Sequence, residues 1–522
     1  MPSLPLLLTG LFFVAILAIA AWGMKKTQNV NDFLLGGGVL GPWILAISYG
    51  AAYFSAVVFI GFAGQYGWLS SYKALWVGVA NAIFGGLVAW LVLGRRTRAM
   101  TRRLNASTTP EFFATRYGSN GMKIAGAVII FLFMLPYSAS VFAGLTYLFT
   151  EVFGISLVAA LTSVVVVTGL YIVFGGYKAA ARIDFLQGII MFVGATAMVW
   201  FVANHFAKEF GGYGAAFAKA SELYRLRLEG AAGELQVAPV DPISPLVFWS
   251  VVFMTSIAPW GLPQMVHKYY AIKDESQIVK GAVVCFVFAL LVGCAAYLTG
   301  AFSHLLPPEI LEKTLTNGAI DPNKLVPTML VECLPQWFLA IILLLVLSAS
   351  MSTLCSLALV SSAAVGVDLV KGFIAPNASE KTHLTIFRVC CAVFVVVSYF
   401  IALFNPSWIV ALMSLSWGAV AGAFLAPYMY GLYWRRTTKA GAIAGMVVGL
   451  LVANGLYWGL FAVEGPGAAK KYSPLVATIA MLVPFVVVPS VSFLSKPLSP
   501  ERVAKAFGDE TDSTAEKNDA VA

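Results

Sequence analysis

Hydroxyl groups are concentrated in one apolar stretch of the chain, residues 348–369, with the sequence SASMSTLCSLALVSSAAVGVDL. Ser352 and Thr353 are adjacent and Ala349 lies about one helical turn earlier, so two hydroxyls and a carbonyl share one level of a helix. Together with carbonyls freed from a second, broken helix, they would complete an all-oxygen cage that suits a hard monovalent cation such as Na⁺. The alternative is that each hydroxyl only bonds back to a carbonyl of its own helix.

The freed carbonyls are expected in residues 47–64, ISYGAAYFSAVVFIGFAG, which lie in an apolar run from Leu40 to Trp68. The run is long enough to cross a bilayer, yet small residues crowd its middle. Where a membrane helix unwinds, its polar groups must meet an ion, a solute or water, because lipid offers no hydrogen bonds. The alternative is close helix packing through the small residues.

Asp184, in GGYKAAARIDFLQG, is the clearest acid at the end of an apolar run. An ionised carboxylate within a span is expensive and usually faces a cavity or a partner. Arg182 is two residues away and would point to another face of the helix, so it is not an automatic partner. Asp184 is interpreted either as a station for a cation leaving the cage or as an interfacial residue at a helix start.

Composition sets the class of protein. Of 522 residues, 60% are hydrophobic and 11% are charged, and the mean hydropathy is +0.85. These values indicate a polytopic helical membrane protein. The net charge of +9 needs no nucleic acid, because basic residues at the cytoplasmic ends of spans explain it. The six cysteines lack metal-ligand spacing, and no catalytic motif is present, so an enzyme is not expected.

The apolar runs predict about thirteen transmembrane helices. Most of the 33 Lys and Arg residues fall in segments that share one face if the N-terminus lies outside, which predicts a cytoplasmic C-terminus. Lys25 and Lys26 follow the first run, which is the reverse of a signal peptide. The runs lie at 4–22, 40–66, 73–94, 124–150, 155–174, 183–206, 245–266, 281–303, 336–366, 386–404, 408–433, 440–462 and 473–494.

Two external loops are long, 207–244 and 304–335. The second contains PPEILEKTL and DPNKLVPTMLVECL, which are typical of short amphipathic helices over the outer face. They are interpreted either as a lid or as passive surface helices. The polar tail, 496–522, is expected to be disordered.

Several stretches together resemble the sodium:solute symporters, a family that includes bacterial proline and sugar symporters. Each motif is weak, but they occur in the family's order between residues 32 and 449. They are DFLLGGGVLGPW (32–43), AAYFSAVVFIG (51–61), TTPEFFATRYG (108–118), LPYSASVFAG (135–144), GGYKAAARIDFLQG (175–188), APWGLPQ (258–264), SMSTLCSLALVSSA (350–363) and YWRRTTKAGAIAGMVVG (433–449).

The resemblance implies a leucine-transporter-like fold with five helices followed by five inverted helices. The second break then falls at 254–265, MTSIAPWGLPQM, where Pro259, Gly261 and Pro263 disrupt a helix on physical grounds alone. The implied units are an N-terminal helix with a cytoplasmic loop (1–39), a first repeat (40–206), an external loop (207–244), a second repeat (245–433), two C-terminal helices (434–495) and the tail (496–522).

The resemblance also implies the site residues. The Na⁺ ligands would be the carbonyls of Ala51, Phe54 and Ala349 and the hydroxyls of Ser352 and Thr353. Asp184 would lie on the ion exit pathway. The solute cavity would be lined by Tyr53, Ser55, Val58, Tyr137, Ser256, Trp260, Gln264 and Trp417.

Some positions differ from those of familiar members of the family, and these differences narrow the choice of transported solute. Tyr53 stands where proline symporters carry an Asp, and Val58 stands where sugar symporters carry a Gln. A sugar needs many hydrogen-bonding side chains, since unpaired hydroxyls are costly to bury. We therefore expect Na⁺-coupled uptake of a small monocarboxylate or an amino acid such as proline, across the bacterial plasma membrane. Expected partners are the solute, Na⁺ and the lipid bilayer, with no nucleic acid, and no oligomeric state is predicted. A proton-coupled symporter and a transporter-like sensor module are the alternatives.

Overall fold

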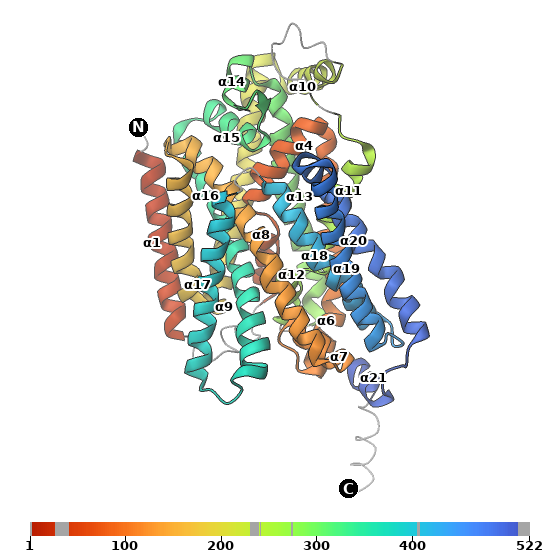
Figure 1. The fold of residues 1–522 in the computed structure, drawn as a ribbon. Coiled ribbons are helices and arrows are strands. Elements are labelled where there is room, and N and C mark those ends of the chain that lie inside the picture. Colours follow the sequence, from red (N-terminus) through yellow and green to blue (C-terminus); the bar gives the residue numbers. More distant parts are fainter. Residues whose placement is uncertain are drawn as a thin grey trace.

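The computed structural model describes residues 3–26, 41–229, 240, 242–272, 275–404 and 408–509. These residues are almost entirely helical, and the helices run between two ends of the molecule (Figure 1). One end carries α10 and α14, and the other carries α6, α7 and α21.

The first half of the described chain contains α1 (Ser3–Lys26), α3 (Pro42–Tyr53), η1 (Val57–Phe62), α4 (Ala63–Ser70), η2 (Ser71–Ala74), α5 (Leu75–Ala80), η3 (Asn81–Val88), η4 (Trp90–Gly94), α6 (Arg95–Leu104), α7 (Thr109–Tyr117), α8 (Asn120–Phe153), α9 (Leu157–Phe210) and α10 (Tyr213–Leu228). The second half contains α11 (Pro245–Ile257), η6 (Ala258–Trp260), α12 (Pro263–Tyr270), η7 (Glu275–Gln277), α13 (Ile278–Ala301), η8 (Phe302–Leu305), α14 (Pro308–Lys313), β1 (Leu315–Thr316), β2 (Ala319–Ile320), α15 (Pro322–Cys333), α16 (Gln336–Ala363), η9 (Ala364–Ile374), α17 (Glu380–Phe404), α18 (Ile409–Tyr433), α19 (Lys439–Glu464), α20 (Pro466–Leu494) and α21 (Pro500–Phe507).

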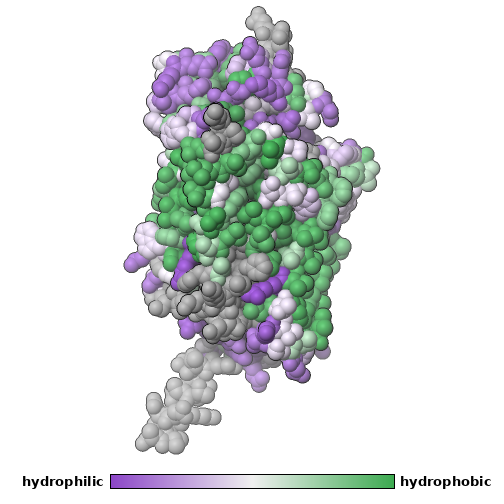
Figure 2. All heavy atoms as spheres, turned by 90° about the vertical axis from the view of Figure 1, so that its left-hand side faces the viewer, coloured by the Kyte–Doolittle hydropathy of each residue, from purple (hydrophilic) through white to green (hydrophobic). Residues whose placement is uncertain are grey.

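Hydrophobic residues cover the middle of the face shown in Figure 2, and hydrophilic residues gather toward its two ends. Ten helices in the described residues are long and apolar enough to cross a bilayer. Three shorter apolar helices lie at Leu4–Ile19, Trp43–Tyr53 and Leu157–Leu170. The protein is therefore a polytopic membrane protein, and the count of about thirteen spans stays a prediction.

Residues 157–210 differ from the expectation of two separate spans, because the structure assigns them to one helical element, α9. Near its start Thr162 hydrogen bonds Tyr399 late in α17, and near its end Phe201 packs on Phe338 early in α16. The start of α16 and the end of α17 lie at the same end of the molecule, since the chain reverses between these two helices. The element therefore makes two passes, and the chain turns back within it.

Both predicted helix breaks are confirmed. The helix α3 ends at Tyr53, Phe54 is extended at φ −104° and ψ 129°, and the helix resumes at η1. The second break separates α11 from α12, with a short 3₁₀ turn that contains Pro259 and with Pro263 at the first turn of α12. Proline lacks the N–H that would continue each helix, which explains the second break.

The described parts of the two long loops contain short helices at one end of the molecule. The loop after α9 contains α10, and the loop after α13 contains α14, the β1–β2 hairpin and α15. A Cβ atom at Gly64 in α4 would collide with the carbonyl oxygen of Pro322, so α15 rests directly on the first broken helix. The expected short helices of 304–335 are present, and their role as a lid stays a prediction.

The polar tail is not disordered throughout, so that expectation is wrong for its first part. Residues Pro500–Phe507 form α21, and Asp509 beyond it pairs with Arg435 through both carboxylate oxygens, at 2.6 and 3.0 Å. Phe507 also packs beneath the guanidinium groups of Arg116 and Arg435. These contacts come from segments distant in sequence and order the helix, while residues 510–522 lie outside the described residues.

Candidate functional site

The hydroxyl groups of α16 meet the first helix break. Thr353 Oγ1 donates to the carbonyl of Ala52 at 3.2 Å and to that of Ala349 at 3.0 Å, so it both bonds back to its own helix and reaches the broken one. Ser352 Oγ is buried and has no hydrogen-bond partner among the described residues. The side chains of Ala51, Phe54 and Ala349 are also fully buried at this level.

This arrangement fits a dehydrated Na⁺. A buried hydroxyl without a partner costs about 1–3 kcal/mol, which a bound cation would offset by accepting its lone pairs. The oxygens gathered here are neutral, and carbonyls at a helix break are the groups that bind Na⁺ in broken-helix transporters. The backbone N–H of Ala56, just after the break, is separately satisfied by Ser350 Oγ at 3.2 Å.

Tyr53, the last residue of α3, connects the two breaks. Its hydroxyl donates to the carbonyl of Thr255 in α11 at 2.6 Å. Within the second break, Trp260 Nε1 donates to the carbonyl of Phe84 in η3 at 2.9 Å. Ser256 Oγ donates to Asn81 Oδ1, also in η3, at 3.1 Å. The element η3 therefore anchors the residues around the second break.

Other residues predicted to line the solute cavity fall into separate groups. Tyr137 in α8 and Trp417 in α18 contact each other edge to face, with ring centroids 5.6 Å apart, and both are buried. Ser55 Oγ accepts from the N–H of Val57, and Val58 is buried one residue later. Gln264 is buried and lines a small enclosed space with Lys268 and Ser356, on the α12 side of the second break.

Asp184 is buried in α9 and belongs to a group of three polar residues. Its Oδ2 accepts a 2.6 Å hydrogen bond from Ser48 Oγ and lies 3.1 Å from Lys268 Nζ, which also donates to Ser48 Oγ at 2.8 Å. Its side chain is 2% exposed and faces these two partners inside the protein, and its place on the ion pathway stays a prediction. The expectation that Arg182 is not its automatic partner agrees with this geometry.

Sequence reasoning missed Lys268, Ser48 and Asn81. Lys268 lies only a few residues beyond the second predicted break, and its side chain is 3% exposed. Its position directly after the apolar run 245–266, close to the predicted break at 254–265, is the signal that could have found it. Ser48 and Asn81 are single polar residues in apolar segments, and this isolation is a weaker signal than that of Lys268.

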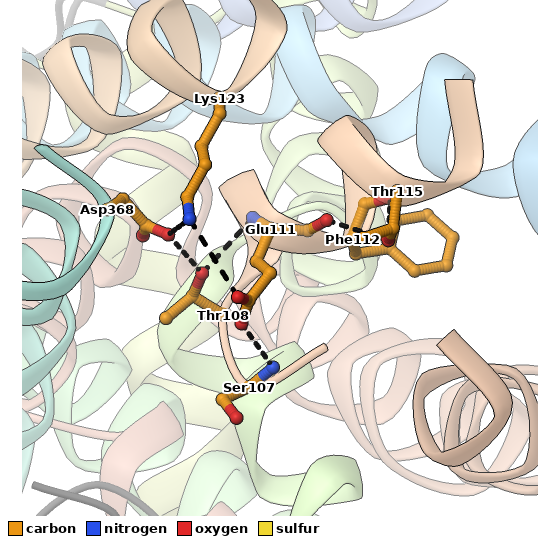
Figure 3. A network of polar contacts seen from close by, with 7 residues as sticks. All are labelled: Ser107, Thr108, Glu111, Phe112, Thr115, Lys123 and Asp368. Atoms are coloured by element: carbon orange, nitrogen blue, oxygen red, sulfur yellow. Dashed lines mark hydrogen bonds and ion pairs between the residues drawn. The ribbon is translucent and has the colours of Figure 1, made fainter. Parts of the chain in front are cut away.

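A second polar network lies at the end that carries α7 (Figure 3). Thr108 Oγ1 donates to Asp368 Oδ1 at 2.8 Å, and Lys123 Nζ lies 3.6 Å from the same oxygen and 3.8 Å from Glu111. Glu111 in turn accepts from the N–H of Ser107 at 2.8 Å. The network joins α7 and the start of α8 to η9, which directly continues α16.

At the opposite end, Arg227 fastens α10 to the first broken helix. Its guanidinium donates to the carbonyl of His304 at 2.8 Å and lies 5.0 Å above the ring of Trp68, which stacks on His304. Burial lowers the pKa of the Arg227 guanidinium to about 10, so it still carries its charge at neutral pH. The hydroxyl of Tyr224 adds a hydrogen bond to the carbonyl of Leu69 at 3.0 Å.

The profile of the Sodium:solute symporter family matches residues 33–449. The chain belongs to this family. It is 28% identical over 466 residues to the osmoregulated proline transporter OpuE of Bacillus subtilis, covering 86% of this chain and 87% of that protein. It is also 28% identical over 464 residues to the sodium/proline symporter of Escherichia coli, covering 86% and 87%. A solved outward-open, substrate-bound Na⁺-coupled sialic acid symporter superimposes with a TM-score of 0.72 at 15% identity, covering 95% of this chain and 99% of that one.

Membership in the sodium:solute symporter family settles the broad function. The chain is an integral membrane protein with a leucine-transporter-like fold that couples solute transport to Na⁺, and it is a transporter rather than an enzyme. Na⁺ is its co-transported ion. The likeness to the sialic acid symporter supports the fold alone.

Proposed function

We propose that the transported solute is a small amino acid, with proline as the first candidate. The relatives named above are proline transporters and match over most of their length. The buried aromatic and aliphatic side chains of Val58, Tyr137 and Trp417 suit a small apolar ring or chain better than a sugar. Amide groups at the helix breaks would hold the carboxylate, as the positive ends of helices do elsewhere. A small monocarboxylate is the second candidate, because it shares the carboxylate.

The proposed Na⁺ site consists of the carbonyls of Ala51, Phe54 and Ala349 and the hydroxyls of Ser352 and Thr353. The observation that carries this assignment is the contact of Thr353 Oγ1 with the carbonyl of Ala52, one residue from the proposed ligand Ala51, beside the unpartnered Ser352 Oγ. The two hydroxyls approach the break in α3–η1 from a packed neighbouring helix. These hydroxyls could therefore bind the ion and contact the broken segment at the same time.

The proposed solute cavity lies between the two breaks and is lined by Tyr53, Ser55, Val58, Tyr137, Ser256, Trp260, Gln264 and Trp417. The hydrogen bond from Tyr53 to Thr255 supports this placement, because it brings the two breaks together. Gln264 lies in the first turn of α12 and would contact the solute from the α12 side of the second break.

The proposed orientation puts α10 and α14 outside and α6, α7 and α21 in the cytoplasm of a bacterial cell. Basic residues support it, since α6 alone contains Arg95, Arg96, Arg98, Arg102 and Arg103. In this orientation α3 and α12 form the cytoplasmic halves of the broken helices. Asp184, level with them, would receive Na⁺ on its way to the cytoplasm.

Uptake by proteoliposomes that contain the purified full-length protein tests this proposal. A panel of radiolabelled proline, alanine, lactate and glucose is offered with an inward Na⁺ gradient, and again with choline in place of Na⁺ at the same pH and potential. Proline should accumulate only with Na⁺, and unlabelled alanine or lactate should compete less well. Accumulation of glucose, or of lactate in preference to both amino acids, would overturn the solute assignment. Uptake driven equally well by a proton gradient in choline would favour the proton-coupled alternative.

A further inference from the structure

Asp184 and Lys268 form a deeply buried ion pair. Their side chains are 2% and 3% exposed, and among the ion pairs of the described residues no other has both partners so completely buried. Burying two charges costs several kcal/mol per ion unless other hydrogen bonds satisfy them, and Ser48 supplies such bonds to both. The three residues come from α9, α12 and α3, so the pair joins the cytoplasmic halves of both broken helices to α9.

The pair lies beyond the Na⁺ cage along one helix interface. The helices α9 and α16 pack in opposite directions, with Phe201 against Phe338 and Gly194 against Leu345. If this pairing of positions continues along the two helices, Gln187 lies level with Ser352. Asp184 then lies about one helical turn beyond Ser352. The small enclosed space lined by Lys268 and Ser356 occupies the neighbouring interface of α12 with α16. A cation that leaves the cage toward Asp184 therefore approaches Lys268.

One carboxylate oxygen of Asp184 is available to bind a cation. Its Oδ1 has no hydrogen-bond partner among the described residues, and neither has the side-chain amide of Gln187, one turn along the same helix face. Both side chains are buried. The ammonium group of Lys268, however, repels a second cation at this distance, because charges interact strongly away from water. Na⁺ and the Lys268 ammonium therefore compete for one carboxylate.

We propose that Lys268 is a tethered counterion that alternates with Na⁺ at Asp184, an inference that rests on the proposed route of Na⁺ past Asp184. When Na⁺ reaches the carboxylate, the ammonium group leaves it, and the contact between α3, α9 and α12 opens toward the cytoplasm. When Na⁺ departs, Lys268 returns and closes the path. The role of Lys268 is positioning: it keeps the cytoplasmic side closed until Na⁺ has arrived, and it helps to expel Na⁺ by replacing it.

The test measures how Na⁺ inside proteoliposomes inhibits uptake of proline. Removing the competitor in Lys268→Met leaves Na⁺ as the sole counterion of Asp184. Half-inhibition should then occur at an internal Na⁺ concentration about tenfold lower, equal to ~1.4 kcal/mol of tighter binding, with a lower maximal rate. Lys268→Arg keeps the charge and should retain the wild-type inhibition constant. The double variant Asp184→Asn/Lys268→Met removes the station itself and should lose the tenfold shift.

The outcomes separate this role from a purely structural one. An unchanged inhibition constant in a transporting Lys268→Met protein would overturn the inference, and so would the same shift in Lys268→Arg. If Lys268→Met does not yield folded protein, Ser48→Ala decides the question, because it removes a hydrogen-bond acceptor of the ammonium group and should shift inhibition in the same direction. No shift in Ser48→Ala would then overturn the inference. Failure of the proposed function is distinguishable, since wild-type uptake would itself be independent of Na⁺.

Discussion

The hydroxyl of Tyr53 donates to the main-chain carbonyl of Thr255 at 2.6 Å, where the helix α11 cannot supply its own donor. Four residues after Thr255 stands Pro259, which has no N–H, so this carbonyl lacks the usual helical hydrogen bond. A side chain at the first break thereby supplies the hydrogen bond that a backbone carbonyl beside the second break lacks. The two broken helices, distant in sequence, are joined at the point where each one unwinds.

Tyr53→Phe should weaken this connection without changing the shape of the side chain. The Thr255 carbonyl would remain buried and unpaired, at a cost of about 1–3 kcal/mol, so both thermal stability and solute affinity should fall. Tyr297→Phe is the matched control, because the buried Tyr297 hydroxyl has no hydrogen-bond partner among the described residues. Thermal unfolding in detergent and the KM of uptake check the prediction. Equal behaviour of the two variants would show that the bond carries no function.

The helix breaks could be predicted from the sequence because their causes are local. Pro259 and Pro263 remove N–H groups within the segment that breaks, and small residues crowd the other segment. Thr353 could be predicted to meet the first break because hydroxyls are rare in apolar runs, and its hydroxyl does contact the carbonyl of Ala52 there. The partner of Asp184 could not be predicted, because Lys268 lies 84 residues away and meets it only when α9 and α12 pack. The same holds for α21, whose order depends on Arg103 and Arg435.

The Na⁺ gradient sets a limit on accumulation that can be measured. One charge crossing at 100 mV contributes about 2.3 kcal/mol, and a tenfold Na⁺ gradient adds about 1.4 kcal/mol. Coupling to one Na⁺ therefore supports accumulation of a zwitterionic amino acid by several hundredfold, since the solute has no net charge. Steady-state uptake in proteoliposomes with a potassium diffusion potential checks this limit. Accumulation far above it would require more than one Na⁺ per cycle.

Arg227 should hold α10 on α4, the last part of the first broken helix. Arg227→Met removes a charged hydrogen bond to the carbonyl of His304 and the contact with the Trp68 ring, so α10 should become accessible to protease and the melting temperature should fall. Arg225→Met is the matched control, because the Arg225 guanidinium in the same helix is mostly exposed and pairs only loosely with Glu229. If the loop acts as a lid, Na⁺-dependent protection of α10 should also disappear in Arg227→Met. Identical digestion patterns for both variants would contradict this clamp.

Asp184→Asn should slow turnover more than it weakens Na⁺ binding from outside. The change removes the negative charge that is proposed to receive Na⁺ beyond the cage. It also leaves Lys268 buried without its counterion, which destabilises the protein. External Na⁺ affinity should change little, because the cage ligands at Ser352 and Thr353 are untouched. Uptake rates at matched expression, measured over a series of external Na⁺ concentrations, separate the two effects. A wild-type rate would remove Asp184 from the ion pathway.

Thr353 offers the sharpest test of the cage, because the proposed backbone ligands cannot be deleted by mutation. Thr353→Ala removes one oxygen at the break in α3–η1, so Na⁺ affinity should fall roughly 10–100-fold, the equivalent of one lost ion contact at about 1.4–2.8 kcal/mol. Thr353→Ser keeps the hydroxyl and should retain most of the affinity. Solute affinity should fall at low Na⁺ and recover at high Na⁺, since coupling between the two sites is reciprocal.

Thr299→Ala is the control for the cage test, because Thr299 is a buried threonine whose hydroxyl donates to the carbonyl of Ala295 four residues earlier. Thr353 makes the same kind of bond to Ala349 but also reaches Ala52 across the helix interface. If Thr353 were only bonded back to its helix, both alanine variants would show the same small effect on uptake. A normally expressed Thr353→Ala protein with wild-type Na⁺ dependence would therefore place the cage elsewhere, whereas a loss confined to Thr353→Ala would locate Na⁺ at the first break.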